Sequence, residues 1–137
     1  MAKESGLGLS VIVDDSASSA NTISNDVTDC KWEMPSDVQD VTGLDKSAKE
    51  RLLLLADFSV TFNGVFNDAS GKSFATFKNY RTLAGSETGR LTVIAHSGQT
   101  LSNTVLYDHF DFSRPQSGEF TWEAGGGLSD GTVPVWS

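Results

Sequence analysis

The chain is poor in cysteine, in long apolar runs and in basic residues, and each shortage excludes a class of protein. Its lone cysteine, Cys30, excludes an internal disulfide, so we expect packing and hydrogen bonds to hold the fold. The longest uninterrupted apolar run, residues 52–56, is too short for a membrane span, and no apolar leader follows Met1. Only 10 basic residues accompany 18 acidic ones, which disfavours a protein that grips nucleic acid.

What is present indicates one folded acidic domain. A length of 137 residues with 38% apolar residues supports a single core but not two. The charge is zoned, with a net charge of −7 over residues 1–45, +3 over residues 46–90 and −4 over residues 91–137. This zoning is either a neutral property of a solvated surface or the sign of acidic and basic patches that meet in self-assembly.

Alternating apolar and polar residues predict mostly short antiparallel strands. The alternation is regular over residues 58–66. Residues 90–112 are expected to form a hairpin around a Gly98-Gln99 turn, followed by a third strand over residues 120–124. A change in the phase of the apolar residues near Thr28 indicates a β-bulge.

One helix is predicted over residues 48–56, because Ser47 and Glu50 form a capping box ahead of four leucines. A weaker helical turn is expected around residues 74–77. The three glycines at 125–127 predict a flexible passage. We therefore expect a mainly β protein: an antiparallel β-sandwich or half-barrel with one packed α-helix. Residues 1–137 would form one domain, with an N-terminal strand and loop at 1–22 and a C-terminal tail at 125–137.

A search for catalytic or cofactor chemistry finds little. G-x-S-x-G, P-loop, dinucleotide-binding and H-E-x-x-H motifs are all missing. In a regular strand Asp108 points away from His109 and Asp111, which leaves two candidate ligands where zinc needs three or four. Cys30 is interpreted as a small buried hydrophobe because it has little basic company. We therefore expect no enzyme, no metal and no cofactor.

A basic and aromatic stretch allows two interpretations. It is either a nucleic-acid-binding surface or, as we favour, a helical turn that buries its aromatic rings and exposes its lysines. The stretch contains Lys72, Phe74, Phe77, Lys78, Tyr80, Arg81 and Arg90.

Several segments, taken in succession, resemble a known family. They are DVTGL at 40–44, the expected helix at 48–56, ADFSVTFNGVFN at 56–67, YRTL at 80–83, SGEFTWEA at 117–124 and DGTVPVW at 130–136. Together they are similar to the major tail protein, or tail tube protein, of long non-contractile-tailed bacteriophages of the siphovirus type. The resemblance extends over roughly residues 23–137 and depends on the order of the segments, since each alone is a common strand or turn pattern.

The resemblance implies a structural virion protein of the tail, assembled in the host bacterial cytoplasm. Six subunits would form a ring, and rings would stack into a tube through which phage DNA passes into the host. It implies contacts with further copies of the chain, with a tape-measure protein and with tail-end proteins, and none with a membrane. No catalytic residue carries over.

Each subunit of this family contributes about four strands to an inner barrel. About 24 strands spaced about 4.8 Å apart give a barrel roughly 45 to 50 Å wide, so its lumen is wet and its wall must be polar. In two of the expected strands every second residue is polar, and these polar residues are the lumen-facing candidates: Ser59, Thr61, Asn63, Glu119, Thr121 and Glu123.

The acidity gains a role in this interpretation. A basic wall would bind duplex DNA by releasing counterions, whereas an acidic wall repels it. The zoned charge then predicts contacts between stacked rings, in which bases on one ring meet acids on the next. The candidate bases are Lys46, Lys49, Arg51 and Lys72, and the candidate acids are Asp14, Asp15, Asp37 and Asp40.

A second class of function stays open. A small β-sandwich binding module, such as a capsid decoration or carbohydrate-binding protein, would be a monomer with an aromatic groove that includes Trp32 or Trp122. A hydrolase ranks third.

Overall fold

The computed structural model describes residue 5 and residues 7–81 and 89–137. The first part of the expected N-terminal segment, residues 1–4 and 6, lies outside the described residues. The described part contains strands and one short helix. In chain order they are β1 (Ser10–Asp14), β2 (Ala20–Thr22), β3 (Val27–Glu33), β4 (Ser36–Asp40), β5 (Arg51–Ala56), β6 (Ser59–Val65), α1 (Ser73–Phe77), β7 (Arg90–His96), β8 (Gln99–Ser113) and β9 (Thr121–Leu128).

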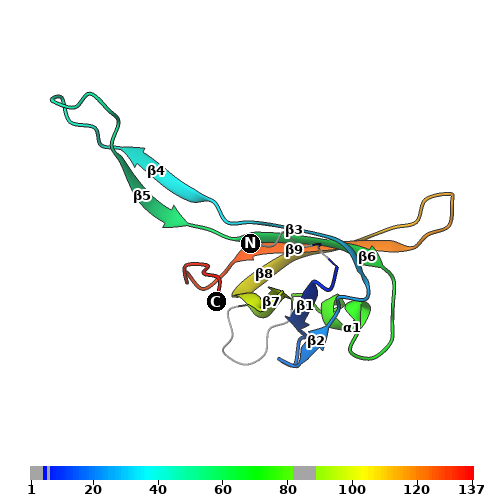
Figure 1. Ribbon diagram of the computed structural model, residues 1–137. Coiled ribbons are helices and arrows are strands. Elements are labelled where there is room, and N and C mark those ends of the chain that lie inside the picture. The colour runs from blue at the N-terminus through cyan, green and yellow to red at the C-terminus, as the bar shows by residue number, and fades with distance from the viewer. Residues whose placement is uncertain (1–4, 6, 82–88) are drawn as a thin grey trace.

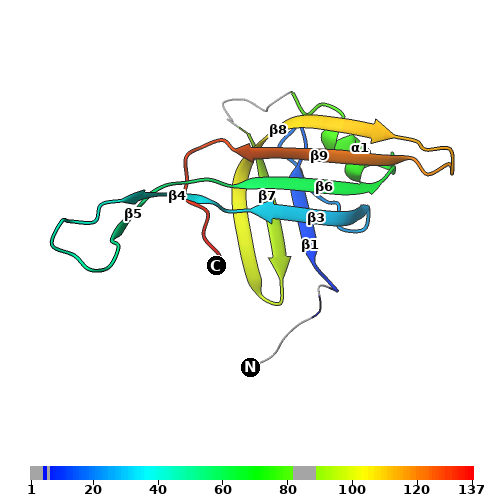
Figure 2. The same ribbon diagram turned by 90° about the horizontal axis from the view of Figure 1, so that it is seen from above.

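Seven strands form one antiparallel sheet in the order β2-β1-β7-β8-β9-β6-β3. The 15-residue strand β8 belongs to both halves of this sheet, because residues 99–105 pair with β7 and residues 105–113 pair with β9. The sheet bends at this strand, so that β1 and β7 lie in one layer and β3, β6 and β9 in the other (Figures 1 and 2). The predicted mainly β fold, an open half-barrel with a helix packed against it, is confirmed.

The core lies between the two layers. Val60 and Phe62 of β6 are buried while Ser59 is exposed, which confirms the predicted alternation. Phe77 of α1 packs on Tyr107 and Trp122, with ring centroids 5.1 and 5.5 Å apart. These contacts attach the helix to the sheet at the centre of the core.

The predicted meander of β7, β8 and β9 is confirmed, but its first turn lies one residue earlier than expected. His96 pairs with Gln99, so the turn consists of Ser97 and Gly98. Both residues have positive φ, at 53° and 83°. A two-residue hairpin turn of this type needs positive φ at both positions, and glycine adopts it without strain.

The helix predicted over residues 48–56 is wrong, because residues 51–56 form strand β5, which pairs with β4. No capping box forms. The backbone N–H of Glu50 instead donates a hydrogen bond of 2.8 Å to the hydroxyl oxygen of Thr42. Pairing with a neighbouring strand outweighs a helix propensity worth only tenths of a kcal/mol per residue. The weaker expectation around residues 74–77 is confirmed by α1, at Ser73–Phe77.

The basic and aromatic stretch follows the favoured interpretation in part. Phe77 is fully buried and Lys78 is exposed, but Arg90 is only 2% exposed. The guanidinium of Arg90 donates hydrogen bonds to the backbone oxygens of Thr76 and Asn79. Arg90 therefore attaches the end of α1 to β7 and is no part of a basic surface.

The predicted bulge near Thr28 is confirmed by a register shift between Val27 and Asp29. The predicted flexible passage is wrong, since the three glycines lie inside β9. A Cβ on Gly126 would stand 2.1 Å from the backbone oxygen of Leu106, so the close approach of β8 requires glycine here. After Leu128 the chain folds back, and Ser137 exchanges two backbone hydrogen bonds of 2.8 Å with Thr100.

No helix in the described part of the chain is long and apolar enough to cross a membrane.

Candidate assembly surfaces

The first surface is the polar face of the sheet formed by β3, β6, β9 and the second half of β8, here called the polar face. Side chains alternate along a strand, so the neighbours of buried Phe62 and Trp122 point away from the core. Asn63 pairs with Asp29 on one side and Glu123 on the other, and Glu123 pairs with Asp111. One polar row therefore runs across all four strands.

Five of the six lumen-facing candidates lie on this polar face, and none of the five is buried: Ser59, Thr61, Asn63, Thr121 and Glu123. Glu119 lies instead in the connection between β8 and β9, where it accepts a hydrogen bond of 2.8 Å from the Ser117 hydroxyl.

The sequence interpretation missed the outer strands of the polar face. β3 contributes Asp29, Lys31 and Glu33, which pair with Asn63, Thr61 and Ser59, and β8 contributes His109 and Asp111. The side-chain nitrogen of Lys31 is 3.0 Å from Glu33, in an exposed ion pair. The alternation of charged and less polar residues after the Thr28 bulge could have identified the polar side of β3. In β8 a second bulge, at Asp108, interrupts the alternation and hides which residues lie on the polar face.

Both edges of the polar face carry unpaired backbone among the described residues. β3 pairs only with β6, and the pairing of β7 with β8 ends at Val105, so residues 106–113 of β8 have β9 as their only neighbour. Free strand edges are templates for pairing with another chain. These two edges lie at opposite ends of a four-stranded unit, as a head-to-tail arrangement of identical subunits requires.

The second surface is the hairpin of β4 and β5, which projects away from the two-layered body (Figures 1 and 2). Its four consecutive leucines, 52–55, alternate between the two faces of the strand, yet all four are exposed. A two-stranded hairpin is marginally stable alone in water, and an apolar surface of this kind marks an interaction site. The sequence interpretation missed this surface because it assigned the leucines to a helix packed on the sheet.

Five of the eight inter-ring candidates lie on this hairpin or its tip: Asp37, Asp40, Lys46, Lys49 and Arg51. Acids and bases are mixed there, because Asp40 is the register partner of Arg51, and Lys46 is 3.7 Å from Glu50. Hydrogen bonds from the side chain and backbone of Thr42 lower the pKa of the Asp40 carboxyl.

The other three candidates lie on the body of the subunit. Lys72 precedes α1, Asp14 ends β1, and Asp15 begins the turn to β2. The Asp15 carboxylate accepts hydrogen bonds from the backbone N–H groups of Ala17 and Ser19, at 2.9 and 3.0 Å. Burial opposes ionisation of Asp15, but these bonds outweigh it and lower the pKa of its carboxyl.

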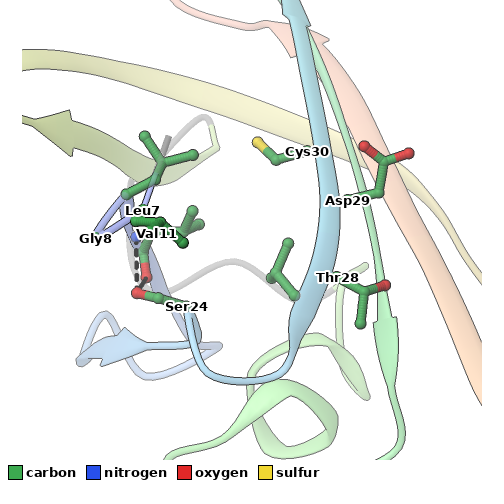
Figure 3. Close-up of a pocket in the computed structure, with 9 residues that line it drawn as sticks. Leu7, Gly8, Val11, Ser24, Thr28, Asp29 and Cys30 are labelled. Carbon is green, nitrogen blue, oxygen red and sulfur yellow. Dashed lines mark hydrogen bonds between the residues drawn. The ribbon is translucent and has the colours of Figure 1, made fainter. Parts of the chain in front are cut away.

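A cleft of about 370 Å³ opens beside β3, between that strand and β1 (Figure 3). Leu7, Val11 and Ser24 line one side, and Thr28 and Cys30 line the other. Burial, and then the neighbouring Asp29 carboxylate, raises the pKa of the Cys30 thiol to about 12. Cys30 is therefore a poor nucleophile and behaves as the small hydrophobe predicted from the sequence.

The aromatic groove that would favour a binding module is not built around Trp122. Trp122 is 2% exposed, and its indole N–H donates to the backbone oxygen of Val65 at 2.8 Å. Trp32 packs on Trp136 of the C-terminal segment, with ring centroids 6.2 Å apart. Both rings thus take part in packing within the subunit.

Comparisons with known proteins bear on the fold. No family model and no curated protein matches the chain. Two solved structures are similar over 98% of this chain and 99% of theirs. One is a chain of the virion of a native gene transfer agent particle, with 17% identity and a TM-score of 0.72. The other is a chain of the tail of an empty gene transfer agent particle with C6 symmetry, with 18% identity and a TM-score of 0.73. The resemblance drawn from the sequence is thus confirmed for the fold, which this chain shares with proteins of such particles.

Proposed function

We propose that this chain is a structural virion protein of a phage-like tail, and that it assembles into stacked hexameric rings enclosing a conduit for DNA. The observation that carries the proposal is the polar face with two free edges. A sheet that is apolar toward its own core, polar on the other face and open at both edges has the features of one segment of a large aqueous barrel.

Ring closure follows from pairing β3 of one subunit with residues 106–113 of β8 in the next. The contact is head-to-tail, so it closes into a ring when a full turn contains a whole number of subunits. The similar chain from a particle tail solved with C6 symmetry supports six subunits. Four strands from each of six copies then give about 24 strands and a lumen wide enough for water and duplex DNA.

Stacking is assigned to the β4–β5 hairpin. Burying its exposed leucines against a subunit of the next ring would contribute about 25 cal/mol for each Å² of apolar surface removed from water. The mixed charges of the hairpin would set the register of that contact, while the leucines would supply most of its free energy.

The polar face would line the lumen. It carries Asp29, Glu33, Asp111 and Glu123 against Lys31, an acidic balance that disfavours adhesion of DNA. Its role would be to enclose DNA without binding it. The tape-measure and tail-end proteins implied by the family resemblance would be its further partners.

Negative-stain electron microscopy of the purified full-length chain tests the proposal. We expect rings about 6-fold in symmetry, or tubes, with a stain-filled lumen. The variant Leu53→Ser/Leu55→Ser should retain rings and lose tubes, because it weakens stacking and leaves the sheet edges intact. A chain that stays monomeric at all concentrations, and in the presence of tail partners, would contradict the proposal and favour a monomeric binding module.

A further inference from the structure

Three potential metal ligands meet on the polar face where β8 lies beside β9. His109, Asp111 and Glu123 each offer one ligand atom, and these atoms all lie within 4.8 Å of one another. Asp111 and Glu123 are register partners, while His109 lies opposite Gly125. The bulge at Asp108 places His109 and Asp111 on the same face as Glu123, so the backbone itself creates the convergence.

The orientation of the His109 ring favours a metal ligand. Its Nδ1 lies 2.6 Å from a carboxylate oxygen of Asp108, and its Nε2 lies 3.8 Å from a carboxylate oxygen of Glu123. An ionised carboxylate only accepts hydrogen bonds, so Asp108 places the proton of the neutral ring on Nδ1. Nε2 then keeps its lone pair on the side of Glu123, as in carboxylate–histidine–zinc arrangements.

The imidazole of His109 lies close against β9. A Cβ at Gly125 would stand 3.0 Å from its Cε1 atom, so glycine at this position lets the ring approach the strand. A hollow of about 240 Å³ adjoins the two carboxylates. Its lining also includes Asn63, Ser113 and Thr121, while His109 lies outside it.

We propose that His109, Asp111 and Glu123 bind a divalent transition-metal ion of the Zn²⁺ class. One imidazole and two carboxylates form a donor set that suits Zn²⁺, and water would take the fourth position. The imidazole disfavours Mg²⁺ and Ca²⁺, which prefer oxygen ligands only. With metal–ligand bonds of about 2.0 to 2.2 Å, the ligand atoms lie about 3.5 Å from one another. Each ligand atom would therefore move by about 1 Å, through rotation of its side chain, when the ion binds.

The site does not depend on ring formation, because all three ligands come from one subunit. The test therefore uses the full-length chain in its natural assembly state, after removal of metals with a chelator. Isothermal titration with Zn²⁺ measures affinity and stoichiometry. The visible absorption of Co²⁺ bound to the unsubstituted chain reports the nitrogen and oxygen ligand environment independently of any variant.

We expect one Zn²⁺ per subunit, with affinity lowered at least tenfold by His109→Gln and by Glu123→Gln. Asp108→Asn should lower it by about tenfold, because Asp108 positions the imidazole without touching the ion. The matched control Asp29→Asn, a carboxylate in the same polar row on β3, should leave affinity unchanged. Absence of saturable Zn²⁺ binding, equal binding by all variants, or selective binding of Mg²⁺ or Ca²⁺ would overturn the proposal. Tubes that form without any metal site would leave the proposed function intact.

Discussion

Asp40 and Arg51 lie directly opposite each other in the β4–β5 hairpin. The sequence interpretation had assigned this acid and this base to opposite faces of stacked rings. The register places this acid and this base side by side on one element, and their part in an inter-ring contact stays a prediction. Two of the candidate bases lie near the tip of the hairpin: Lys46, which is 3.7 Å from Glu50, and Lys49.

Reversing the charge at the hairpin tip should therefore block stacking. In Lys46→Glu/Lys49→Glu, the changed tip would meet the acidic surface of the next subunit with like charges, which repel. We expect rings or monomers but few tubes by electron microscopy, and the defect should lessen in high salt. Lys78→Glu/Arg81→Glu makes the same change of net charge on the body and should form normal tubes. Normal tubes from both double variants would exclude this contact.

The glycine triplet in β9 allows a sharp test of strand packing. Gly126→Ala should lower the free energy of unfolding by about 3 kcal/mol, because its Cβ would lie 2.1 Å from the Leu106 backbone oxygen. Gly127→Ala is the matched control, since its Cβ would lie 3.7 Å from the backbone oxygen of Phe58, an ordinary contact. Urea unfolding of both variants measures the difference. Equal stabilities would mean that β8 can move away from β9 at no cost.

The thiol of Cys30 should react slowly in the folded chain. Burial, and then the Asp29 carboxylate, raises the pKa of this thiol from its ordinary range to about 12. At pH 8 the reactive thiolate is then on the order of 10²- to 10³-fold scarcer than in the unfolded chain. Labelling with a disulfide reagent should accelerate by a comparable factor in denaturant. Asp29→Asn should speed the folded reaction only modestly, because the carboxylate is the smaller cause; equal folded and unfolded rates would show that the thiol is freely accessible.

The sequence predicts most of the sheet and little of the hairpin, for physical reasons. Strands that are half-buried carry a period of two, so the alternation in β6 and the meander of β7, β8 and β9 could be read directly. The leucines of β5 are exposed on both faces, and such a run has no period that distinguishes strand from helix. Only pairing with Ser36–Asp40, a tertiary fact, determines its structure.

The candidate site follows the same division. The polar parity of β6 and β9 was visible because each strand is regular, and five of the six lumen candidates share one face. The cluster around His109 could not be predicted in this way. In a regular strand Asp108 would point away, which leaves only His109 and Asp111 as ligands. The bulge at Asp108 changes the register of β8, and the third ligand, Glu123, lies on the neighbouring strand β9. The order of polar and apolar residues along one strand reveals neither the bulge nor the pairing between strands.

If the polar face lines the lumen, neutralising its carboxylates should hinder DNA passage. Removing negative charge lets Lys31 and other donors hold phosphates that the acidic wall would otherwise repel. Particles built with Asp111→Asn/Glu123→Gln, or with Asp29→Asn/Glu33→Gln, should release DNA more slowly or with greater dependence on salt. The second pair lies outside the proposed metal ligands, so an effect shared by both pairs reports wall charge and not metal binding.

Asp68→Asn/Asp130→Asn removes the same charge from outside the polar face and should leave release unchanged. Time-resolved fluorescence of a DNA dye outside purified particles measures the rate at low and at physiological salt. Screening shortens the range of the wall charge to about 8 Å at physiological ionic strength, so any difference should be largest at low salt. Identical release from all three double variants at every salt concentration would mean that the acidity of this face plays no part in DNA passage.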